Sequence, residues 1–157
     1  MKESSVVKTN KLVVLHPWVE KLFLCTLLMG LSMDYAGMEV MELLRISLGG
    51  LAITYFLGAY LPAPAVPKEE QPAGMGRLLG SIVVPKVLWM SSGISLGAAV
   101  LYTLDMGNDG FLSMASTGGS TILLALIILV FIALSDIKNV KSAFPVVLRA
   151  LPCLVLD

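Results

Sequence analysis

The sequence predicts an all-α integral membrane protein, a four-transmembrane-helix bundle built from two helical hairpins, with both termini cytoplasmic. The composition is the first reason, because 57% of the residues are hydrophobic and only 14% are charged, whereas a soluble domain carries about 25% charged residues. The second is that the apolar residues fall into four long runs. A helix crosses a bilayer with about 20 such residues. The third is the placement of the basic residues between these runs.

The first apolar run opens with His16-Pro17-Trp18. Proline suits the first turn of a helix, and tryptophan suits the lipid headgroup zone. Its uncharged core, Leu22–Met33, is shorter than a span, so the helix must extend over Glu20 and Lys21 at one end and Asp34 at the other. We expect these terminal charges to reach the membrane interface.

A cleaved signal peptide is the alternative for this segment, because Gly30-Leu31-Ser32 offers small residues at a suitable spacing. We favour a retained span, since 21 residues precede the apolar run and a strong A-x-A site is absent.

The return helix of this hairpin carries small residues every four positions, at Gly50, Thr54 and Gly58. The third run contains a G-x-x-x-G pair, Gly93 and Gly97. Such spacing places small residues on one face, where another helix can approach closely. We expect the Gly93–Gly97 face to pack within the bundle, with self-association as the alternative.

Polar segments divide the chain into five parts. Residues 62–78 are rich in proline and charge, which predicts an extended linker rather than a helix. The tail after residue 135 is apolar but too short to span, so we expect an interfacial segment or one packed on a partner. The expected parts are a cytoplasmic segment 1–16, hairpin 17–61 (helices 18–37 and 43–61), linker 62–78, hairpin 79–135 (helices 82–104 and 116–135) and tail 136–157.

Basic residues assign the orientation. If the N-terminus is cytoplasmic and the spans alternate, ten of the eleven basic residues lie inside and only Arg45 lies outside. The positive-inside rule therefore favours four spans with cytoplasmic termini in a bacterial inner membrane. The inside residues are Lys2, Lys8, Lys11, Lys21, Lys68, Arg77, Lys86, Lys138, Lys141 and Arg149.

The two hairpins also show a weak internal similarity. Asp34 and Asp105 each follow an apolar run and are 71 residues apart, and the pairs Gly49-Gly50 and Gly118-Gly119 in the return helices are 69 apart. These offsets predict two parallel hairpin repeats, of the kind related by an axis along the membrane normal in some transporters.

The first turn carries a further resemblance. Asp34-Tyr35-Ala36-Gly37 between two apolar helices resembles the turn of GldL-like transmembrane hairpin proteins of Bacteroidota, which have His-Trp-Pro-Gly there. Asp34 would stand for the histidine, Tyr35 for the tryptophan and Gly37 for the glycine. The gliding motor subunit also needs an acid within its membrane helix, and Ile46–Leu61 has none, so the resemblance implies the hairpin and not motor activity.

Charges near the apolar runs are the candidate functional groups, since a charge inside lipid is costly. They are Asp34, Glu42, Arg45 and Lys86, and each lies close to a helix end. We expect interfacial anchoring rather than ion translocation. We also predict that Arg45 has an acidic partner. The contact that we single out is with Asp34 across the turn, and Glu42, three residues before Arg45 on the same helical face, competes with it.

Reactive constellations are weak in this sequence. His16 is the single histidine, and we expect it to flank the first helix rather than act as a base. Cys25 and Cys153 form no C-x-x-C pair, and Asp105 to Asp109 lacks the EF-hand ligand pattern. We therefore expect no enzyme activity, no metal and no cofactor.

These observations lead to two functional hypotheses. The first is a non-catalytic subunit or scaffold of a larger membrane protein complex, contacting the bilayer and other membrane subunits or a second copy, with no nucleic acid. The alternative is a small oligomeric transporter or cation channel whose acidic outer turns attract cations. The interaction candidates are Asp34, Glu42, Arg45, Gly50, Gly58, Gly93 and Gly97.

Overall fold

The computed structural model describes residues 11–62, 75, 78–105, 108–135, 140–141 and 143–156. The regular structure in these ranges is entirely helical, as predicted. Most of the predicted linker 62–78 lies outside the described residues. The elements are α1 (Lys11–Tyr35), α2 (Met41–Gly58), a π-helical turn η2 (Leu78–Val83), α4 (Val84–Thr103), α5 (Asn108–Ser135) and α6 (Phe144–Leu156).

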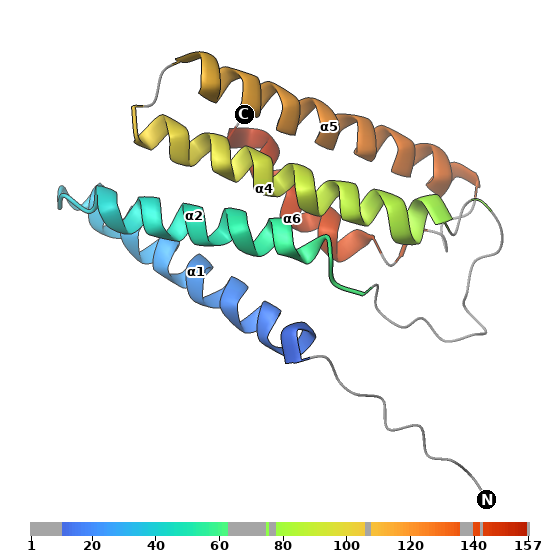
Figure 1. The fold of residues 1–157 in the computed structure, drawn as a ribbon, viewed down its shortest axis with the longest axis horizontal. Coiled ribbons are helices and arrows are strands. Elements are labelled where there is room, and N and C mark those ends of the chain that lie inside the picture. Colours follow the sequence, from blue (N-terminus) through green and yellow to red (C-terminus); the bar gives the residue numbers. More distant parts are fainter. Residues whose placement is uncertain are drawn as a thin grey trace, which may run out of the picture.

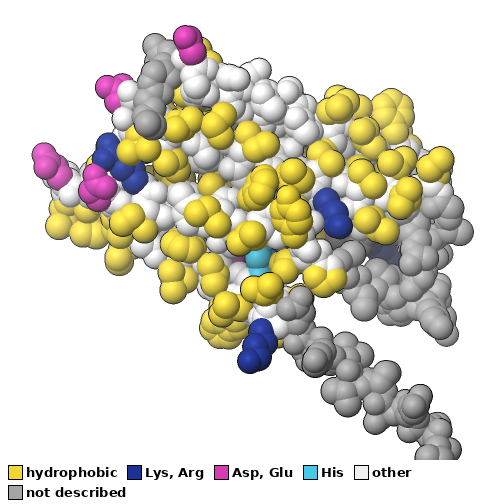
Figure 2. Space-filling model, viewed as in Figure 1, with side chains coloured by type: hydrophobic (Ala, Val, Ile, Leu, Met, Phe, Trp, Pro, Cys, Tyr) yellow, Lys and Arg dark blue, Asp and Glu magenta, His cyan; other side chains and the backbone are white. Residues whose placement is uncertain are grey.

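Four of these helices are long and apolar enough to cross a membrane: α1, α2, the continuous helix of η2 and α4, and Asp109–Ser135 of α5. The prediction of four long apolar helices is therefore confirmed. Figure 2 shows apolar side chains over most of the visible face, while acidic side chains gather at the end formed by the α1–α2 and α4–α5 turns. This distribution suits a protein whose flanks face lipid and whose turns face water.

The long helices stand side by side in chain order (Figure 1). α1 packs on α2, α2 on α4 and α4 on α5, while α6 lies across one face of this row against α4 and α5. Helices that are neighbours in the chain thus pack on one another, and α6 covers part of one face of the row.

The core is centred on α4, which is covered by α2, α5 and α6. Leu88 of α4 and Ile122 of α5 are fully buried, and Ala150 of α6 meets the same cluster. α1 contributes little to the core, because Glu20 and Gly30 are its only buried residues. The two edges of the row, α1 and α5, thus expose broad apolar faces.

Two helices begin earlier than the sequence predicts. α1 starts at Lys11, so that Pro17 lies inside the helix and not in its first turn. α5 starts at Asn108 rather than near residue 116. Within the predicted part of α5, the glycine at position 118 would disfavour a helix on propensity alone, but a side chain there would overlap Ser95 of α4. Close packing on α4 therefore overrides the local preference.

The turns after α1 and α4 share a geometry. After α1, the Met38 N–H donates to the Met33 carbonyl (3.1 Å) and the Gly37 N–H to the Asp34 carbonyl (2.9 Å). These bonds form a Schellman motif, which places Gly37 in the left-handed region at φ 80°. After α4, Asp105 takes the same place, with φ 54°.

This geometry gives a different register for the predicted internal repeat. The two left-handed residues, Gly37 and Asp105, are 68 positions apart, and so are the last residues of the two helices, Tyr35 and Thr103. Identical residues at this offset include Pro17 with Pro85 and Gly50 with Gly118. The offset of 71 fails because Asp34 lies within its helix and Asp105 lies beyond the end of its own.

Candidate functional site

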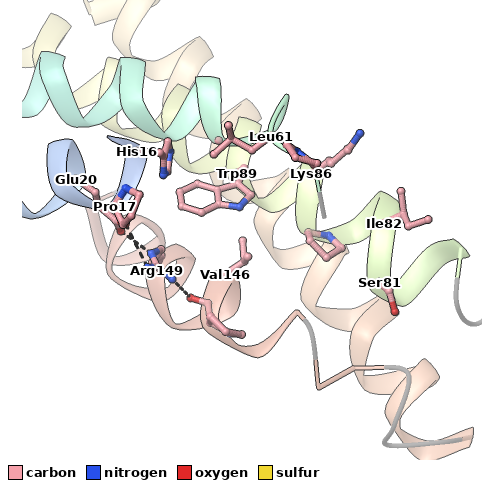
Figure 3. A pocket seen from close by; sticks show the side chains of 14 residues that line it. His16, Pro17, Glu20, Leu61, Ser81, Ile82, Lys86, Trp89, Val146 and Arg149 are labelled. Carbon is pink, nitrogen blue, oxygen red and sulfur yellow. Dashed lines mark hydrogen bonds and ion pairs between the residues drawn. The ribbon is translucent and has the colours of Figure 1, made fainter. Parts of the chain in front are cut away.

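A polar cluster lies where α1, α2, α4 and α6 meet, away from the α1–α2 turn, and Figure 3 shows it from close by. Its centre is Glu20 of α1, which is only 4% exposed. Arg149 of α6 donates from Nε to one carboxylate oxygen (2.5 Å) and from Nη2 to the other (3.2 Å). This two-point contact matches the planar guanidinium to the planar carboxylate and gives the pair a fixed orientation.

The sequence of α6 explains why Arg149 points at α1. Val146, Ala150 and Cys153 are buried at helical spacing and fix one face of α6 on the row. Arg149 lies beside this face, and its Nη1 also donates to the Pro145 carbonyl one turn earlier (2.9 Å). Bonding to Glu20 raises the pKa of the Arg149 guanidinium above its ordinary value, so this group stays charged.

Aromatic rings surround the ion pair. The Arg149 guanidinium carbon lies 5.5 Å from the ring centroid of Trp89, within the range of a cation–π contact. Tyr55 meets Trp89 edge-on, with ring centroids 5.0 Å apart. Glu20 accepts two hydrogen bonds from Arg149 of α6, which compensates the cost of burying its charge.

His16 links α1 to α2 at the same level. Its Nε2 lies 2.9 Å from the Thr54 carbonyl oxygen. Because a carbonyl only accepts, Nε2 is the donor in this bond. The imidazole also meets Trp89 edge-on, with centroids 5.3 Å apart. His16 thus bridges three helices, a larger structural role than the flanking position that the sequence predicts.

A cavity of about 230 Å³ adjoins the cluster. Trp89 and Pro85 of α4 form one wall, and Arg149 forms another. Lys86 also borders it, but this side chain is exposed and extends outward in Figure 3. Since Glu20 and Arg149 are bound to each other, the cavity presents a paired carboxylate, not one free to act as a base or nucleophile.

Arg45 has the acidic partner that the sequence predicts. Its Nη1 lies 2.6 Å from Glu42 Oε1. Nε and Nη2 donate to the Thr103 carbonyl at the end of α4, at 3.1 and 2.5 Å. The predicted contact of Arg45 with Asp34 is wrong, because Glu42 lies three residues before Arg45 on the same helix face and takes that place. Asp34 is exposed and makes no ion pair with the described residues.

The predicted small residues of α2 contact two different helices. A Cβ atom at Gly50 would overlap the Phe23 ring of α1. A Cβ atom at Gly58 would lie 2.8 Å from the Trp89 ring of α4. The stripe that includes both residues therefore seats α1 on one side and α4 on the other.

The G-x-x-x-G pair of α4 also packs within the chain. A Cβ atom at Gly93 would lie 3.0 Å from the Ala52 carbonyl oxygen and 3.0 Å from the Phe56 nitrogen, so α2 and α4 approach backbone to backbone. At Gly97 it would lie 3.1 Å from the Met114 methyl of α5. These glycine faces are thus occupied by the chain itself, as the first of the two sequence interpretations holds.

The Glu20–Arg149 pair is the feature that the sequence analysis missed. The sequence predicts that Glu20 lies at the membrane interface, yet its side chain is buried within the protein. The tail is expected on the interface or on a partner, yet α6 packs on α4 and α5 of its own chain. The available signal was that Glu20 and Arg149 are opposite charges in apolar segments on the same predicted side of the membrane. Their partnership depends on how α6 folds back, which no local pattern reveals.

Comparisons and metal-site geometry add no further assignment. Within the ranges that the structure describes, no three His, Cys, Asp or Glu side chains gather as metal ligands would. Comparison with protein-family models, with curated proteins and with solved structures finds no match. The resemblance to GldL-like hairpins therefore stays a prediction.

Proposed function

We propose that the chain is a non-catalytic structural subunit or scaffold of a larger protein assembly in the bacterial cytoplasmic membrane. The observation that carries the proposal is the closed ion pair of Glu20 and Arg149. An unpaired acid inside a membrane helix is typical of ion pathways, but this carboxylate is held by Arg149 in a two-point contact. Such a contact favours a rigid frame over a group that changes its charge during transport.

The proposed orientation places this cluster on the cytoplasmic side. It lies in the half of the row that contains the starts of α1 and α6, which follow predicted cytoplasmic segments. The acidic turns at the opposite end then face the periplasm. This assignment follows the positive-inside rule, and it gives two hairpins that cross the membrane with both termini inside.

The exposed edges of the row support a role in assembly. α1 is almost unburied along its length, and α5 exposes Leu124 and Phe131 at 58% and 70%. Lipid can cover these faces, and so can another membrane helix of matching shape.

Purification of the tagged chain from its native membrane in mild detergent tests this proposal. We expect other membrane subunits in a fixed stoichiometric ratio. The test variant is Leu28→Trp on the exposed face of α1. It should reduce the ratio of partner subunits to chain without reducing the amount of folded chain. Recovery of a homo-oligomer that conducts ions would contradict the proposal.

A small transporter or cation channel is the second candidate, favoured by the cavity of about 230 Å³ beside Glu20. Reconstitution in liposomes tests it by measuring cation or proton flux across the bilayer. A transport role for Glu20 requires flux in the unaltered chain and its loss in Glu20→Gln. The structural proposal requires flux no greater than in protein-free liposomes.

A further inference from the structure

The two edge helices of the row, α1 and α5, correspond in the predicted repeat to α4 and α2, the two helices that form the interface between the hairpins. With the register of 68 residues, α1 corresponds to α4 and α2 corresponds to α5. Within the chain, α2 packs on α4. The faces that would make the corresponding contact belong to α5 and α1, at the opposite edges of one row, where they cannot reach each other.

The centre of the α2–α4 interface identifies the corresponding surface positions. There, Gly93 of α4 approaches the backbone of α2 at Ala52 and Phe56. Adding or subtracting 68 gives Cys25 on α1 for Gly93, and Ser120 and Leu124 on α5 for Ala52 and Phe56.

All three corresponding residues are exposed and keep the size pattern of the internal interface. Cys25 and Ser120 are small, and Leu124 is a large apolar side chain that is 58% exposed. Small residues at the crossing point permit close approach, and the leucine can fill the space beside it. The chain thus carries the two faces that another contact of the α2–α4 type needs, and neither face is occupied within the described residues.

We infer that α5 of one copy packs against α1 of a second copy in the way that α2 packs on α4. The occupant is a second copy of the chain, because the new α5–α1 contact repeats the α2–α4 contact one hairpin further along the row. The inference deepens the proposed function, on which it rests, by naming one component of the assembly. Since the two faces differ, the contact is heterologous, and repeated addition forms a closed ring or an open array.

Cysteine cross-linking in membranes tests this contact directly. The chain already carries Cys25 on α1, so Ser120→Cys supplies the second thiol. A disulfide requires Cα atoms within ~7 Å. Oxidation of isolated membranes with copper phenanthroline should therefore link Ser120→Cys chains into dimers and longer ladders. Removing Cys25 by Cys25→Ser in the same chain should abolish the ladder.

Ser113→Cys is the matched control, because Ser113 is exposed on the same face of α5 seven residues earlier. This spacing displaces the thiol by about 10 Å along the helix, so we expect no ladder. Equal ladders from both variants would show random collision and overturn the inference. No ladder from either would show that lipid or another subunit covers these faces.

The inferred contact and the proposed function can fail separately, and the two experiments show which one has failed. Stoichiometric partner subunits without the Cys25–Ser120→Cys link would overturn this inference and leave the structural role standing. A specific link in an oligomer that conducts ions would support the contact and contradict the structural role.

Discussion

At the level of single residues, the ion pair of Glu20 and Arg149 forms at the cost of removing two charges from water. The pair is stable only if each charge stays matched. Glu20 is 4% exposed, so its carboxylate depends on Arg149 to compensate the water that it has lost. Single and double substitutions are therefore expected to behave very differently.

Arg149→Ala should lower the free energy of unfolding by about 3 kcal/mol, since it leaves a buried carboxylate without its counter-ion. Glu20→Leu combined with Arg149→Met should restore most of this loss, because an apolar pair of similar volume avoids the desolvation cost. Denaturant titration in detergent micelles measures both values. Losses that simply add in the double variant would show that the two side chains act independently.

The Arg45–Glu42 pair gives the contrasting case. Glu42 has 79% of its side chain exposed, and exposed ion pairs contribute about 0–1 kcal/mol. We expect Glu42→Gln to change the free energy of unfolding by less than about 1 kcal/mol, in the same titration. A loss as large as that of Arg149→Ala would mean that the outer end of the row is buried in the native assembly.

At the level of helices, backbone contact between α2 and α4 sets the spacing of the row. Gly93→Ala places a Cβ atom 3.0 Å from the α2 backbone and should destabilise the chain by about 1–3 kcal/mol through overpacking. Gly49→Ala is the matched control, because nothing lies within 4 Å of a Cβ atom there. It should be neutral or stabilise by up to about 1 kcal/mol. Equal changes in stability from Gly93→Ala and Gly49→Ala would show that α2 and α4 do not approach each other closely at Gly93.

The tail helix depends on its small buried residues. Ala150 is fully buried against the row, so Ala150→Leu should lift α6 and raise hydrogen exchange across 143–154. Leu151→Ala alters a residue that is 44% exposed on the same helix and should leave exchange nearly unchanged. Mass spectrometry of exchanged peptides measures both, and equal exchange in the two variants would contradict the observed orientation of α6.

Over the whole molecule, the four long helices were predictable because lipid imposes length and apolarity on each span. Arg45 and its acidic partner were predictable because Glu42 and Arg45 share a helix face. The packing of α6 on α4 and α5 was not, because it depends on how the tail folds back onto the row. The Glu20–Arg149 pair joins residues 129 positions apart, and periodicity holds no information at that separation.

The repeat shows the same limit. Aligning the aspartates by residue type gave an offset of 71, whereas backbone geometry gives 68, because Gly37 and Asp105 share the left-handed position after a helix. Residue type alone cannot reveal that a glycine and an aspartate fill the same place.

The membrane topology underlies every functional proposal, and one measurement tests it most directly. Met38 in the first turn and Met75 between the hairpins are both exposed, at 52% and 73%. Each is replaced by cysteine and treated in spheroplasts with a membrane-impermeant maleimide. Four spans with cytoplasmic termini predict that Met38→Cys is labelled at once and that Met75→Cys is labelled only after lysis. Equal labelling of the two in intact spheroplasts, or the reverse order, would contradict this topology.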